Sequence, residues 1–175
     1  MAVITPSSLG SLGLHLLNCV CNALRANGRP VCSCALRHAA AYPSMDDCCE
    51  CGAGEGQAWV RVQRVDLAPE SPTLKADATP CAGQMLRVTF DAGVYRCVTA
   101  IHPNGTGPTD DEFNTDTLGA LADHEIMRTA ISCCPKPDEN WRWYPTTWVP
   151  LGPLGGCAGG MLSVVAIGKF TPTAI

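Results

Sequence analysis

Cysteine is the residue type whose chemistry stands out in this sequence. The chain holds 12 cysteines in 175 residues, and the densest groups are Cys32-Ser33-Cys34 and Cys48-Cys49-Glu50-Cys51, with His38 between them. Thiols can bind zinc, exchange electrons through a Cys-x-x-Cys pair, or form structural disulfides. These three kinds of chemistry are the alternatives for the segment from residue 29 to residue 56.

A zinc site would draw on Cys32, Cys34, Cys48, Cys49 and Cys51, or on three of these thiolates and His38. The usual spacing is a pair of Cys-x-x-Cys turns, whereas the first group here is Cys-x-Cys and the second has an additional cysteine. A thioredoxin-like redox site needs a strand-to-helix turn, but a glycine-rich run follows the second group. The sequence therefore favours buried thiols or disulfides that fix a loop, and zinc stays open as the alternative.

The short separation of the two cysteine groups along the chain suggests one disulfide within this segment. A disulfide between Cys32 and either Cys48 or Cys49 would close a short loop. We therefore expect Cys32 to pair with one of these two neighbours.

Motifs for catalysis are not found elsewhere in the sequence. It contains no glycine-rich phosphate loop, nucleophile elbow or His-Glu-x-x-His run. The acidic pairs at Asp46-Asp47 and Asp110-Asp111 are typical of a turn and a helix start. His15 has only Cys19 one helical turn away, so we interpret it as an ordinary helix histidine. We assign no catalytic, cofactor-binding or metal-ligating residue and do not expect an enzyme.

Charge and hydropathy restrict the possible partners and location. The net charge is −4, the isoelectric point is near 5.4, and the 12 Lys and Arg residues are dispersed. A sequence-specific nucleic-acid surface is therefore not expected, because such surfaces cluster basic residues. The first arginine, Arg25, follows the first apolar stretch, which disfavours a secretion signal. No apolar run approaches the roughly 18 residues of a membrane span, so we expect synthesis in the cytosol and no membrane contact.

Two helices should supply much of the core. The first begins near Thr5-Pro6-Ser7-Ser8, carries an apolar stripe from Leu9 to Leu24, and ends at Asn27-Gly28. The second begins at Thr109 or Asp110, runs to about Ser132, and is stopped by Pro135. We expect the apolar positions of the second helix to form one face that packs on a hairpin. These positions are Phe113, Leu118, Leu121, Ala122, Met127, Ala130 and Ile131.

Alternating apolar residues predict the strands. Gln57 to Leu67 reads as a strand with a bulge near Gln63 or Arg64, and Met161 to Phe170 as a final strand. A hairpin is predicted from Met85–Phe90 and Val94–Ile101 around Asp91-Ala92-Gly93. The expected fold class is α+β: two helices packed on a small, mainly antiparallel sheet, in the order α-β-β-β-α-β, with a Cys-rich loop after the first helix.

The domain organisation is expected to be simple. A hydrophobic content of 46% over 175 residues suits a single domain, residues 1–175, with its own core. The predicted loops are the Cys-rich loop 29–56 and the extended loops 68–80 and 135–160. The last of these carries an aromatic cluster, which either caps the core or anchors a subunit contact. Its members are Trp141, Trp143, Tyr144 and Trp148.

The order of these features resembles the tail terminator proteins, or head-to-tail connector proteins, of long-tailed actinobacterial phages. The resemblance spans Asn27 to Phe170, and one departure is Met45, where the family commonly has tryptophan. The residues that carry it are Gly28-Arg29-Pro30-Val31-Cys32-Ser33-Cys34, Met45-Asp46-Asp47-Cys48-Cys49, Gly56-Gln57-Ala58-Trp59-Val60-Arg61-Val62, Cys97, Cys133-Cys134 and Trp148-Val149-Pro150-Leu151-Gly152-Pro153-Leu154-Gly155-Gly156-Cys157-Ala158-Gly159-Gly160.

The resemblance implies a structural virion protein that assembles in the host cytoplasm and needs no cofactor. Copies of the chain would form a ring, a hexamer by family resemblance, that caps the tail tube and joins it to the head-neck connector. The implied partners are the chain itself, the major tail tube protein and a head-completion or stopper neck protein, with phage DNA passing through the lumen. The alternatives are another neck role, such as head completion or stopper, and a small zinc-stabilised adaptor module.

Overall fold

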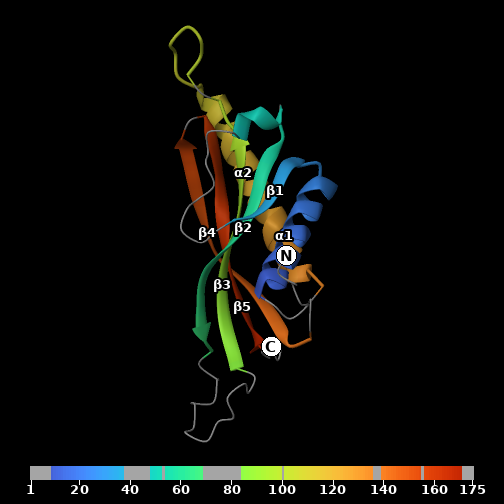
Figure 1. The fold of residues 1–175 in the computed structure, drawn as a ribbon. Helices are drawn as coiled ribbons and strands as arrows, with labels where there is room; N and C mark the ends of the chain where they lie inside the picture. The colour runs from blue at the N-terminus through green and yellow to red at the C-terminus, as the bar shows by residue number, and fades with distance from the viewer. Residues whose placement is uncertain are drawn as a thin grey trace, which may run out of the picture.

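The computed structural model describes residues 9–37, 48–52, 54–68, 84–99, 101–135, 139–154 and 156–170, and the statements below concern these residues (Figure 1). The elements in chain order are α1 (Leu9–Ala26), β1 (Val31–Arg37), a short 3-10 helix η1 (Cys48–Cys51), β2 (Gly56–Leu67), β3 (Gln84–Cys97), α2 (Asp110–Cys133), β4 (Trp141–Leu154) and β5 (Cys157–Phe170).

The strands form one sheet in the order β1-β2-β3-β5-β4. Only the β1–β2 pair is parallel, and the other three pairs are antiparallel. Helix α1 contacts β1 and β2, α2 contacts β4 and β5, and the two helices contact each other. The predicted α+β class, with two helices packed on a mainly antiparallel sheet, is confirmed.

Local signals fixed the helix ends as predicted. Gly28 follows α1 with φ of 70°, the left-handed conformation that glycine adopts without a steric penalty. Thr109 caps α2, and its hydroxyl oxygen accepts a hydrogen bond from the Glu112 backbone N–H. The Glu112 carboxylate in turn accepts from the Thr109 N–H, which completes a capping box. The predicted start of α1 at residues 5–8 lies outside the described residues.

The main core lies between the helices and the sheet. On β3 every second residue from Leu86 to Val94 faces the helices, and each such large side chain contributes roughly 1.5–3 kcal/mol when buried. The buried residues of α1 that meet this face are Leu12, Gly13, Leu16, Leu17, Val20, Cys21 and Leu24. A second cluster, on the opposite face of the sheet, contains Cys48, Trp59, Tyr95, Cys157 and Met161.

The predicted hairpin around Asp91-Ala92-Gly93 is wrong, because β3 runs through these residues without a turn and ends at Cys97. Asp91 is completely buried, and its carboxylate binds Arg61 at 2.9 Å and accepts the Ser163 hydroxyl at 2.9 Å. Gly93 pairs with Trp59 on β2, and a side chain at Gly93 would overlap the Trp59 ring. Tertiary contacts therefore explain both residues that resembled a turn.

Two predicted loops contain strands. The Cys-rich loop 29–56 includes β1 and η1, and the extended loop 135–160 includes all of β4 and the start of β5, which begins at Cys157 rather than Met161. The bulge predicted in β2 is confirmed by a register shift between Val62 and Arg64. The extended loop predicted at 68–80 lies outside the described residues apart from Ala68.

The aromatic cluster divides between core and surface. Trp141 is fully buried in the main core, and Trp143 and Trp148 pack against that core. Tyr144 is half exposed. The cluster therefore caps the core, and Tyr144 is the member that faces solvent.

Glycine on β5 allows the close approach of β3. A Cβ atom on Gly159 would collide with the carbonyl oxygen of Val94, a backbone atom that cannot move without disturbing the sheet. We expect Gly159→Ala to lower the free energy of unfolding by at least about 1–3 kcal/mol. Urea denaturation measures this loss. Gly107→Ala is the control, because nothing lies within 4 Å of a Cβ there, and equal stability of the two variants would contradict the packing argument.

Candidate functional site at the cysteine-linked end of the sheet

A buried carboxylate on α2 organises one end of the molecule. Asp123 is 1% exposed and is bound by two arginines from different segments. Arg29 donates from Nε and Nη2 to the two carboxylate oxygens at 2.8 and 2.9 Å. Arg96 does the same at 2.7 and 3.0 Å. We call this group of three residues the Asp123 clamp; its charge-assisted, bidentate bonds compensate the cost of burying the charge.

The arginines of the clamp also bind backbone carbonyls. Arg96 Nη1 donates to the carbonyls of Pro30 and Gly54, at 3.0 Å each. Arg29 Nη2 donates to the Gly119 carbonyl at 2.8 Å, and its contact with Asp123 raises the pKa of the guanidinium. The clamp therefore ties α2 to the end of β3, to the turn between α1 and β1, and to the residues before β2.

Disulfides close the same end of the sheet. Cys48 of η1 bonds Cys157 of β5, and the neighbouring Cys49 bonds Cys97 of β3. The first of these links residues 109 positions apart, a loop size for which closure is worth roughly 4–5 kcal/mol in the chain-entropy model. Two more disulfides, Cys19–Cys134 and Cys21–Cys34, hold α1 to the end of α2 and to β1.

The expected pairing of Cys32 with Cys48 or Cys49 is wrong. Cys32 bonds Cys51, because the parallel pairing of β1 with β2 brings the start of β1 beside the residues that precede β2. The five cysteines considered for zinc are not gathered in one place, since Cys34 lies with Cys21 of α1 and Cys48 with Cys157. His38 lies outside the described residues.

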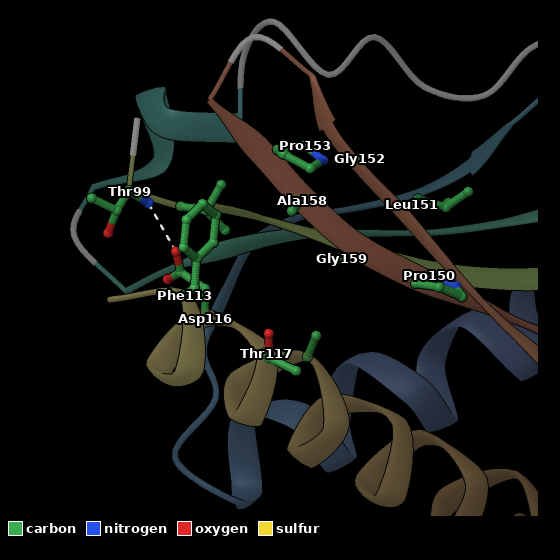
Figure 2. Close-up of a pocket in the computed structure, with 12 residues that line it drawn as sticks. Thr99, Phe113, Asp116, Thr117, Pro150, Leu151, Gly152, Pro153, Ala158 and Gly159 are labelled. Atoms are coloured by element: carbon green, nitrogen blue, oxygen red, sulfur yellow. Dashed lines mark hydrogen bonds between the residues drawn. The ribbon is translucent and has the colours of Figure 1, made fainter. Parts of the chain in front are cut away.

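A groove runs between the first half of α2 and the end of the sheet (Figure 2). Its volume is about 200 Å³. Asp116 is the only titratable residue of the lining, and its carboxylate accepts the Thr99 backbone N–H at 3.0 Å. The residues that line the groove are Val98, Thr99, Phe113, Asp116, Thr117, Ala120, Pro150, Leu151, Gly152, Pro153, Ala158 and Gly159.

The groove is small and mostly apolar. Its volume is below the roughly 300 Å³ at which small-molecule sites begin. The lining offers no pair of nucleophile and base, because its one carboxylate already holds a backbone amide. The groove can accept an apolar side chain or a short stretch of another chain.

The apolar face predicted for α2 is only half correct. Met127 and Ile131 are fully buried, but Phe113, Leu118 and Leu121 are 51%, 66% and 46% exposed. Asp123, near the middle of the helix, takes the inward position one turn before Met127, so the clamp replaces apolar packing there. We call Phe113, Leu118 and Leu121 the α2 patch.

Sequence reasoning missed the clamp, although α2 carries a sign of it. Asp123 lies four and eight residues before Met127 and Ile131, on the inward face of the helix. A carboxylate at such a position needs a buried cation. The sequence does not say which of its 12 Lys and Arg residues that cation is.

No family model matches the chain, and the search of curated proteins also gives no match. Within the described residues, no helix has both the length and the apolar character needed to cross a membrane.

Removing the charge at the centre of the clamp should destabilise the fold. Asp123→Asn leaves two partly buried guanidinium groups without their carboxylate, and we expect the free energy of unfolding to fall by about 3–5 kcal/mol. The matched control is Asp66→Asn. Asp66 pairs with Arg64 on the surface, where the Arg64 side chain is 62% exposed and that of Asp66 is 39% exposed, so this substitution should cost less than about 1 kcal/mol. Chemical denaturation of both variants in the same redox buffer gives the comparison. Similar losses would mean that the clamp is not the main restraint on α2.

Proposed function

We propose that the chain is a structural virion protein, a tail terminator whose copies form a ring on the end of the tail tube and join it to the neck. The observation that carries the proposal is the α2 patch, whose three apolar side chains face solvent in the subunit. Exposed apolar side chains grouped on one helix are typical of a surface that another protein covers. The sequence resemblance supplies the identity of the assembly.

The residues that carry the resemblance are architectural in this structure, which supports a non-catalytic role. Arg29 belongs to the Asp123 clamp. Cys48 and Cys49 hold η1 to the sheet through disulfides with Cys157 and Cys97. Gly160 lies against the Trp148 ring, where a side chain would overlap it. These contacts fix the end of the sheet and the groove beside it.

The charge distribution supports contact between unlike surfaces of two copies. The start of α2 is acidic, with Asp110 and Asp111 exposed beside the groove. At the opposite end of the sheet Arg87 and Arg142 both pair with Ile167, and Lys169 follows two residues later. Joining unlike ends is electrostatically favourable, and such heterologous contacts form a ring when the rotation from one copy to the next closes on itself. The same acidic surface would repel DNA passing through the ring.

The outer strands differ in how well they could accept a neighbouring strand. β4 carries Pro145, Pro150 and Pro153, which have no N–H to donate, so its edge is a poor template for pairing. β1 is the other outer strand and contains no proline. Strand addition between copies would therefore use β1.

The α2 patch should be needed for assembly and not for folding. Leu118→Arg places a charge at the most exposed position of the patch, so we expect the chain to stay folded and its self-association to weaken at least roughly tenfold. Sedimentation velocity measures the association, and circular dichroism checks the fold. Thr129→Arg, an exposed position on the same helix, is the control. Unchanged association of the Leu118 variant would remove the α2 patch from the interface.

The terminator role itself predicts a defect in tail length. Deleting the gene from the phage that encodes this chain should give tails of uncontrolled length, because tube polymerisation would not be stopped. Electron microscopy of lysates measures the lengths, and a plasmid copy of the gene should restore them. Tails of normal length that fail to join heads would instead favour a head-completion or stopper role.

A further inference from the structure

Four cysteine sulfurs converge at one point beside the groove. Cys48 and Cys49 are adjacent in η1, and Cys97 of β3 pairs directly with Cys157 of β5. The Sγ atoms of Cys48 and Cys49 are 3.8 Å apart, and those of Cys48, Cys49 and Cys157 all lie within 4.8 Å of one another. The Cys97 sulfur is bonded to that of Cys49 and completes the group.

This arrangement matches the donor set of a structural zinc site. Such sites are tetrahedral with Zn–S bonds of about 2.3 Å, which places neighbouring sulfurs roughly 3.8 Å apart. The distance between the Cys48 and Cys49 sulfurs fits this spacing. The sulfurs come from three separate elements, so a bound ion would hold η1, β3 and β5 together, as the two disulfides do.

We propose that the reduced chain binds one zinc ion through the thiolates of Cys48, Cys49, Cys97 and Cys157, and that two disulfides take over when the chain is oxidised. In the cytosol, where synthesis is expected, thiols are kept reduced and are free to bind zinc. In the oxidation, each cysteine pair gives two electrons to one molecule of a low-molecular-weight disulfide, which leaves as two thiolates. Zn²⁺ is released and two Cys–Cys bonds form. The site is independent of the proposed role in the tail.

The set differs from the one considered in the sequence. It keeps Cys48 and Cys49, but Cys97 and Cys157 replace Cys32, Cys34 and Cys51, because the pairing of β3 with β5 brings together two cysteines far apart in the chain. A second group of possible donors, His15, Cys19 and Cys134, offers one imidazole and two sulfurs. The His15 ring nitrogen there already contacts the carbonyl of Pro135. The four-sulfur group is therefore the better zinc site.

Zinc analysis of the reduced chain tests the proposal. The full chain is purified without oxygen in a phosphine reductant, incubated with zinc chloride, desalted and analysed for metal. We expect about one tightly bound zinc per chain. Cys49→Ser and Cys97→Ser should weaken zinc binding at least roughly tenfold. Two control variants should bind zinc as the unmodified chain does: Cys19→Ser, from the group with His15 and Cys134, and Cys133→Ser, which removes an exposed free thiol. Absence of zinc in the reduced chain, or its loss only in Cys19→Ser, would overturn the proposal.

A measurement on the unmodified chain covers the case in which the serine variants do not fold. Zinc should protect Cys48, Cys49, Cys97 and Cys157 from alkylation by iodoacetamide, as located by peptide mass spectrometry, and leave Cys133 reactive. Cobalt in place of zinc should give the sulfur-to-metal absorption of a four-thiolate site. Protection of a different set of cysteines would refute the assignment.

Discussion

The contact on which this structure most depends is the buried Asp123 carboxylate between Arg29 and Arg96. A carboxylate that is 1% exposed needs a paired cation and hydrogen bonds to both oxygens, and here each of two arginines binds both oxygens. Arg96 also donates to carbonyls of the turn before β1 and of the residues before β2. The position of α2 over the sheet is therefore set by polar geometry at its middle, which is directional in a way that apolar packing is not.

Helical phase explains why the surface of α2 is unusual. Asp123, Met127 and Ile131 recur every four residues on the inward face, whereas Leu118 and Leu121 lie on the outer side of the helix and form the α2 patch with Phe113. The helix also stands away from the sheet in its first half, which leaves the groove between Phe113, Leu151 and Pro153. Larger apolar side chains on the inward side of the first half of α2 would have filled this groove but left the α2 patch exposed. The two surfaces therefore have separate origins: small and polar residues such as Asp116 and Ala120 leave the groove, and helical phase exposes the patch that we propose as the assembly surface.

The features predicted correctly from the sequence are those that local physics determines. The stripe of α1, its glycine cap, the capping box of α2 and the bulge in β2 each depend on residues a few positions apart. Features set by distant contacts were missed. The three prolines of β4 suggested a loop, but an outer strand tolerates proline. Asp91-Ala92-Gly93 suggested a turn, because the sequence does not show that Asp91 pairs with Arg61 and that Gly93 lies against Trp59 across the sheet. The cysteine pairing and the clamp join residues up to 115 positions apart, and spacing alone does not determine such partners.

The short helix η1 is rich in cysteine, and it has little apolar packing that could hold it against the sheet. It has four residues, three of them cysteines, and only Cys48 is buried. The apolar area of one small side chain is far too little to offset the cost of ordering four residues, roughly 1–2 kcal/mol each for the backbone. All three cysteines are bonded, to β1, β3 and β5, so each supplies a restraint that packing does not. In the reduced chain these restraints are lost unless something else binds the sulfurs, and a metal ion held by four of them would restore the link to β3 and β5 in one step. The proposed zinc ion would thus keep this end of the sheet ordered in the reduced chain, where disulfides alone could not.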